Sequence, residues 1–108
     1  MLFLFTSVLL PAVRELESVF SGTEGQSVTL RCNYETDDAV AYLHWYKHHS
    51  DIQAPQFILW KQGKGRSTEN IPDERKYGSQ TSDTSTTLTI RELALADTAL
   101  YYCAVETQ

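Results

Sequence analysis

Two stretches of the chain alternate between apolar and polar residues. Residues 25–33 (GQSVTLRCN) are apolar at every second position from Val28 onward, and residues 42–47 (YLHWYK) place Leu43 and Trp45 on one face. Because successive side chains of a strand point to opposite faces, this period of two predicts half-buried β-strands. The polar residues between the two stretches predict a connecting loop.

Short apolar segments separated by turn residues continue to the end of the chain. We expect strands at residues 56–60, 75–80, 84–90 and 99–105, a glycine-bearing tight turn at 62–66 and one helical turn at 94–97. Seven or eight short strands with frequent turns are typical of two packed sheets rather than of a parallel α/β fold. The pattern therefore predicts an all-β sandwich.

Length and charge narrow the classes of function. A chain of 108 residues is the size of one domain and can fold without a metal or cofactor. The net charge of −5 argues against nucleic acid as a partner. No P-loop, nucleophile elbow or dinucleotide fingerprint occurs, and His44 and His48 would lie about 13 Å apart on a strand, too far to share a metal. We therefore expect a binding protein without catalytic activity, metal or cofactor.

The N-terminus is apolar. Residues 1–13 read MLFLFTSVLLPAV, a run too short to cross a bilayer but of the length found in the apolar part of a secretory signal peptide. We expect residues 1–16 to be a signal peptide and residues 17–108 to form the domain. The alternative is a buried N-terminal strand.

Secretion would allow the two cysteines to form a disulfide. Oxidising compartments permit thiols to pair, so Cys32 and Cys103 are expected to form one bridge. Their separation of 103 − 32 = 71 residues closes a long loop, which in the chain-entropy model is worth about 4 kcal/mol.

A combination of three features points to a family. Trp45 lies thirteen residues after Cys32, and Cys103 ends the segment DTALYYC. This arrangement is similar to that of immunoglobulin-type variable domains. The chain resembles T-cell receptor alpha (or alpha/delta) variable segments in particular. That likeness is carried by TLRCNY (29–34), LHWYK (43–47), PQFIL (55–59) and DTALYYCAV (97–105).

The resemblance implies a V-type Greek-key sandwich in which the disulfide joins the two sheets and the Trp45 indole packs on its sulfurs. It implies that the Tyr101 hydroxyl bonds backbone upstream, and that Arg75 and Asp97 form a salt bridge. The chain stops at Gln108 without the F-G-x-G joining motif. We therefore expect the final strand of the domain to be missing and the edge of the preceding strand to be unpaired.

The resemblance also implies antigen recognition by loops at one end of the sandwich. The expected ligand is a peptide–MHC complex, and the expected location is the extracellular side of the plasma membrane, with signalling subunits contacted through regions outside this chain. The first loop is acidic and the second basic, which suggests a role in orienting the ligand. The expected loop residues are Glu35, Thr36, Asp37, Asp38 and Ala39 in the first loop, Lys61, Gln62, Lys64 and Arg66 in the second, and Val105 and Glu106 in the third.

A second surface follows from the alternation along two strands. Tyr46, His48 and Tyr102 point away from the core, and Pro55 is expected to join them. The resemblance implies that a T-cell receptor beta or gamma variable domain covers these residues. Most variable domains have glutamine where this chain has His48, so the resemblance does not carry over the usual amide pair across that interface. The alternative is a lone domain with scattered surface aromatics.

Two other functions of the same fold class remain open from the sequence. One is a V-type adhesion or inhibitory receptor ectodomain, and the other is an immunoglobulin light-chain variable segment. The light-chain assignment would favour glutamine at position 48 and different residues after Cys103.

Overall fold

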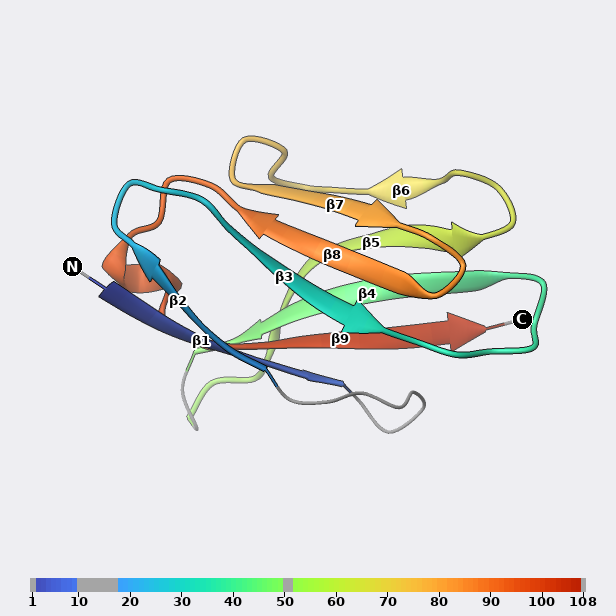
Figure 1. The fold of residues 1–108 in the computed structure, drawn as a ribbon, viewed down its shortest axis with the longest axis horizontal. Coiled ribbons are helices and arrows are strands. Elements are labelled where there is room, and N and C mark those ends of the chain that lie inside the picture. The colour runs from blue at the N-terminus through green and yellow to red at the C-terminus, as the bar shows by residue number, and fades with distance from the viewer. Residues whose placement is uncertain (1, 10–17, 50–51, 108) are drawn as a thin grey trace.

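The computed structural model describes residues 2–9, 18–49 and 52–107. The strands are β1 Leu2–Leu9, β2 Ser18–Thr23, β3 Val28–Asn33, β4 Ala41–His48, β5 Gln56–Lys64, β6 Glu69–Asn70, β7 Tyr77–Thr81, β8 Ser85–Ile90 and β9 Leu100–Thr107, and η1 (Leu95–Asp97) is a 3₁₀ turn. They form one sheet with the order β2-β1-β9-β4-β5-β6 and a second with the order β3-β8-β7, stacked face to face (Figure 1). The predicted all-β sandwich is confirmed.

Alternation decides which residues of β3 and β4 form the core. Leu30 and Cys32 on β3 are buried, as are Leu43 and Trp45 on β4, while their neighbours face outward. Leu30, Cys32 and Trp45 belong to the main apolar core between the two sheets, and Leu43 belongs to a smaller apolar cluster. Burial of this kind is the main favourable contribution to folding.

The turn predicted at residues 62–66 is wrong in its position. Strand β5 continues through Lys64, and the chain reverses at Gly65, whose φ of +97° is a conformation that few residues other than glycine adopt. Gly63 stays in the strand instead. A Cβ there would lie 2.7 Å from the Leu43 side chain, so the glycine serves close packing rather than a turn.

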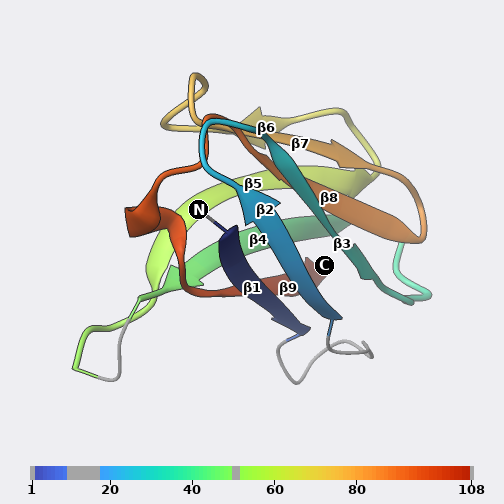
Figure 2. The ribbon, with the colours of Figure 1, turned by 60° about the vertical axis from the view of Figure 1, so that its left-hand side comes forward.

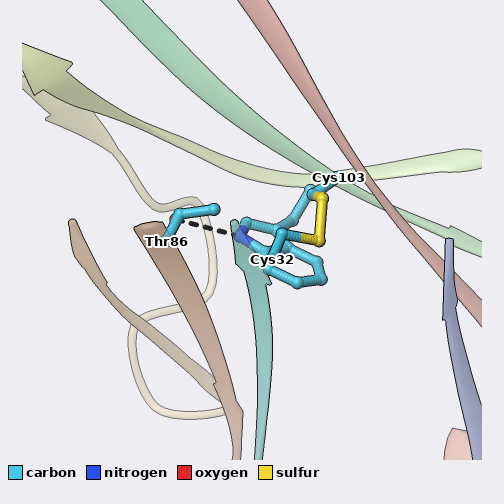
Figure 3. The surroundings of a disulfide bond; sticks show 4 residues. Cys32, Thr86 and Cys103 are labelled. Carbon is cyan, nitrogen blue, oxygen red and sulfur yellow. Dashed lines mark hydrogen bonds between the residues drawn. A yellow bond between two sulfur atoms is a disulfide. The ribbon is translucent and has the colours of Figure 1, made fainter. Parts of the chain in front are cut away.

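A disulfide joins the two sheets. Cys32 on β3 and Cys103 on β9 are bonded, with 6.6 Å between their Cα atoms (Figure 3). The Trp45 side chain is fully buried in the same core, and its indole Nε1 donates a hydrogen bond to Thr86 Oγ1 at 3.3 Å. The indole therefore lies in the core without an unsatisfied N–H group.

The crossover from β8 to β9 is fixed by a buried tyrosine. The Tyr101 hydroxyl donates to the backbone oxygen of Asp97 at 2.5 Å, and the side chain is fully buried. Burial, followed by the neighbouring Tyr77 and Asp97, raises the pKa of Tyr101 far above its usual value. The hydroxyl therefore stays protonated near neutral pH and remains a hydrogen-bond donor.

Asp97 pairs with a different cation from the one expected. Lys76 Nζ lies 2.6 Å from Asp97 Oδ2, whereas Arg75 is exposed in the turn before β7. The expectation of an Arg75–Asp97 salt bridge is therefore wrong. The physical reason is that β7 begins at Tyr77, so the turn directs residue 76 toward η1 and leaves residue 75 in solvent. Asp97 Oδ2 also accepts the Ala94 backbone N–H at 2.8 Å.

The edge of β9 is partly covered. Thr6–Leu9 of β1 run parallel to Leu100–Cys103 of β9, and β1 pairs in turn with β2 (Figure 2). The expectation of an unpaired edge is therefore wrong for this half of β9. Exposed backbone groups at a sheet edge favour pairing with any available strand, and β1 satisfies them here. No helix in the described part of the chain is long and apolar enough to span a membrane.

We predict that Lys76→Met destabilises the domain by about 1–3 kcal/mol, because the buried Asp97 carboxylate loses its cation. Urea unfolding measures this change. Arg75→Met is the matched control and should change the unfolding free energy by less than about 0.5 kcal/mol. Equal losses in the two variants would contradict the assignment of Lys76.

Candidate functional site

A hollow on the outer face of the six-stranded sheet collects four residues that the sequence marked as outward-facing. Tyr46, His48, Pro55 and Tyr102 line a cavity of about 410 Å³. Tyr46 lies opposite Tyr102 in the β4–β9 register, and the His48 ring meets the Tyr102 ring edge-on at 6.2 Å. The hollow that these four residues line is called the outer groove below.

Further aromatic rings extend this face beyond the outer groove. Phe57 on β5 is 42% exposed and meets Tyr46 edge-on at 5.9 Å. His44 stacks on Tyr46 at 6.3 Å with an interplanar angle of 15°. Phe57 and His44 were not among the residues predicted for this surface, although the position of His44, two residues before Tyr46 on β4, gave the signal. The face is thus a continuous aromatic surface of a kind that partner proteins cover.

The candidate ligand surface is the end of the sandwich where the β3–β4 loop, the β5–β6 turn and the end of β9 come together (Figure 1). In the first loop, Glu35, Asp37, Asp38 and Ala39 are exposed. Thr36 is half-buried, and its hydroxyl accepts the Asp38 backbone N–H at 3.2 Å. The carboxylates of this loop are therefore presented to solvent by a locally hydrogen-bonded backbone.

Of the three basic residues expected to face a ligand from the second loop, two are hydrogen-bonded within the domain. Lys64 Nζ donates to the Thr36 backbone oxygen at 2.7 Å and so ties the second loop to the first. Lys61 lies within β5, where its Nζ donates to the Ser79 backbone oxygen at 3.1 Å. Arg66 is exposed, and within the described residues its side chain makes no hydrogen bond or ion pair. Arg66 is therefore the cation of this set that is available to a ligand.

Gln62 was expected to contact antigen, and this expectation is wrong because the side chain is buried. The residue is 6% exposed. Its Nε2 donates to the Lys64 backbone oxygen at 2.7 Å, and its Oε1 accepts the Thr68 hydroxyl at 2.7 Å. The Gln62 backbone oxygen also accepts the Thr81 hydroxyl at 3.0 Å. The buried Gln62 side chain therefore stabilises the β5–β6 turn through hydrogen bonds to Lys64 and Thr68.

Tyr34 is a structural residue of this end that the sequence analysis did not assign. Its hydroxyl donates to the Ser82 backbone oxygen at 2.5 Å, which fixes the β7–β8 turn beside the first loop. A Cβ at Gly63 would collide with this hydroxyl, so Gly63 makes room for the tyrosine. Burial and the nearby Asp83 carboxylate raise the pKa of Tyr34 above its ordinary value.

The two residues expected at the start of the third loop have different positions. Val105 points inward and packs on a small core cluster with Tyr34, Ala41 and Leu43, so its expected role as a loop contact is corrected. The Glu106 side chain is 62% exposed, and its Oε1 lies 3.1 Å from His44 Nε2. The Glu106 carboxylate is therefore held on the outer face of the sheet.

Comparison with known proteins agrees with this geometry. The immunoglobulin V-set domain family matches residues 15–108. Human T cell receptor alpha variable 38-1 is 34% identical over 95 residues, covering 85% of this chain and 78% of that protein. Human T cell receptor beta variable 9 is 40% identical over 81 residues, covering 74% and 68%.

A solved structure shares the fold across the whole chain. It is described as "Structural basis of T cell specificity and activation by the bacterial superantigen toxic shock syndrome toxin-1". The superposition has a TM-score of 0.66 at 15% identity and covers all of this chain and 82% of that one.

The fold and the family match together define an immunoglobulin V-set domain. The chain belongs to this family and, within it, to the T-cell receptor variable domains. This family is not enzymatic.

Proposed function

We propose that the chain is the antigen-recognition variable domain of a T-cell receptor alpha or delta chain, and that it pairs with a beta or gamma variable domain. The observation that carries the pairing is the outer groove, an apolar cavity of about 410 Å³ on an exposed sheet face. A hollow lined by Tyr46, Pro55 and Tyr102 suits an apolar or aromatic anchor from a partner. A lone domain gains nothing from exposing such a surface.

The proposed ligand is a peptide–MHC complex bound at the loop end. The support is the charge distribution there, with the exposed acids Glu35, Asp37 and Asp38 on the first loop and the exposed Arg66 on the second. Complementary charges steer encounter and set register more than they add affinity. Because Lys64 holds the first loop through Thr36, the two loops would meet the ligand as one unit.

The alpha or delta assignment is the finer part of the proposal. The chain is similar to human alpha variable 26-1 at 34% identity and to human beta variable 5-6 at 40% identity, so identity alone does not separate the two chain types. The segment CAV (residues 103–105) favours the alpha type over the light-chain alternative. An adhesion receptor would carry the same fold with a different partner surface.

We propose an extracellular position at the plasma membrane, as part of a receptor whose signalling subunits contact regions outside this chain. Residues 1–16 are proposed as a secretory signal peptide that is removed. The alternative is retention of Leu2–Leu9 as strand β1, the arrangement in the structure. The mass of the secreted chain distinguishes removal from retention.

We predict that Tyr102→Asp weakens pairing at least tenfold, because it places a charge in the apolar outer groove. The chain is co-expressed with a T-cell receptor beta chain, and heterodimer dissociation is measured by sedimentation. Gln80→Asp adds the same charge to the opposite sheet and should leave dissociation unchanged. Unchanged heterodimer dissociation in the Tyr102→Asp variant would refute the proposed interface.

We predict that Arg66→Glu weakens binding of the heterodimer to its peptide–MHC ligand by up to about fivefold, as expected for one exposed charge. The ligand is selected from a peptide–MHC tetramer panel with the parent heterodimer. Lys64→Glu should instead lower the melting temperature, because the bond to Thr36 is lost. Unchanged binding with Arg66→Glu, together with unchanged melting of Lys64→Glu, would refute this account of the loop end.

A further inference from the structure

A second hollow lies on the outer face of the six-stranded sheet, apart from the outer groove. Its volume is about 340 Å³, and it is lined by Tyr42 and His44 of β4, Trp60 of β5 and Glu106 of β9. None of these residues lines the outer groove. The hollow that these four residues line is called the upper hollow below.

Two aromatic rings form walls of the upper hollow. The Tyr42 and Trp60 ring centroids are 5.5 Å apart with an interplanar angle of 84°, so the two ring planes are nearly perpendicular. The face of each ring carries negative electrostatic potential. Tryptophan and tyrosine faces attract an ammonium or guanidinium group within about 6 Å, and tryptophan does so most strongly.

An acidic group completes the upper hollow. Glu106 makes its hydrogen bond to His44 through Oε1, and one such bond leaves a carboxylate with further lone pairs. The nearest lysines along β5 are committed elsewhere, since Lys61 donates to the Ser79 backbone and Lys64 to the Thr36 backbone. The carboxylate is thus positioned by His44 without being neutralised by a lysine or arginine of the described residues.

We propose that the upper hollow binds a cationic side chain, a guanidinium or an ammonium group, that the pairing domain supplies. Aromatic faces and a carboxylate together favour a cation, while an anion would be repelled by Glu106 and a neutral group would leave its charge unmatched. This inference rests on the proposed pairing.

The position of the upper hollow identifies the pairing domain as the source of the cation. The His44 ring stacks on Tyr46, which lines the outer groove, so the two hollows are neighbours on one face. A domain large enough to cover the outer groove therefore extends over the upper hollow as well. Protein–protein interfaces of standard size bury about 800 Å² on each partner, more than one hollow alone requires.

The first experiment uses the full chain and a small cationic probe. N-acetylarginine amide is titrated while the indole N–H resonances of the two tryptophans are followed by NMR. The Trp60 resonance should shift and saturate in the millimolar range, whereas the buried Trp45 resonance should not move. N-acetylcitrulline amide, which has a similar shape without charge, should bind at least tenfold more weakly. Equal responses to the two probes would overturn the proposal.

Two variants test the acidic group. Glu106→Gln should weaken binding of the arginine probe at least fivefold while the Trp45 resonance confirms that the fold is intact. Glu24→Gln removes the same charge from an exposed position outside both the upper hollow and the loop end, and should leave binding unchanged. Equal weakening in both variants would show a general charge effect and would refute a specific site.

The last experiment tests the source of the cation. In the heterodimer with a T-cell receptor beta chain, the Trp60 resonance should no longer respond to added arginine probe, because the partner fills the upper hollow. A persisting response in a dimer that sedimentation shows to be intact would refute the pairing domain as the source. Absence of any dimer would instead refute the proposed pairing and leave the probe result on the free chain standing.

Discussion

The covalent bond between Cys32 and Cys103 is the constraint on which the rest of the structure depends. It joins strands in opposite sheets, which otherwise meet through side-chain packing around the buried Trp45. A cross-link over 71 residues restricts the unfolded chain far more than a local contact does. Because these cysteines must point inward, the alternation of side chains along a strand also determines whether each remaining residue of β3 and β9 points inward or outward.

The proposed functional surfaces follow from this constraint. Since Trp45 and Cys103 face the core, their neighbours Tyr46 and Tyr102 must face outward, where they line the outer groove. The same alternation places Glu106 on the outer face, next to the upper hollow. A domain of this kind therefore presents an aromatic outer face as the direct consequence of forming its core, and the loops at its end are supported by buried residues such as Gln62 and Tyr34.

Alternation along strands was enough to predict the sandwich and the outward set on β4 and β9, and the presence of two cysteines in a chain expected to be secreted was enough to predict the disulfide. It could not predict contacts that depend on where a strand ends. The longer β5 buries Gln62, and the start of β7 selects Lys76 in place of Arg75 as the partner of Asp97. Pairing of β1 with β9 joins segments more than 90 residues apart, and nothing local in either segment signals it.

The measurement that tests the central claim most directly is the unfolding free energy of the double variant Cys32→Ala/Cys103→Ala, compared with the oxidised chain in denaturant. The account predicts a loss of about 4 kcal/mol or complete failure to fold at 37 °C, because the 71-residue cross-link no longer restricts the unfolded chain. An unfolding free energy equal to that of the oxidised chain would contradict it.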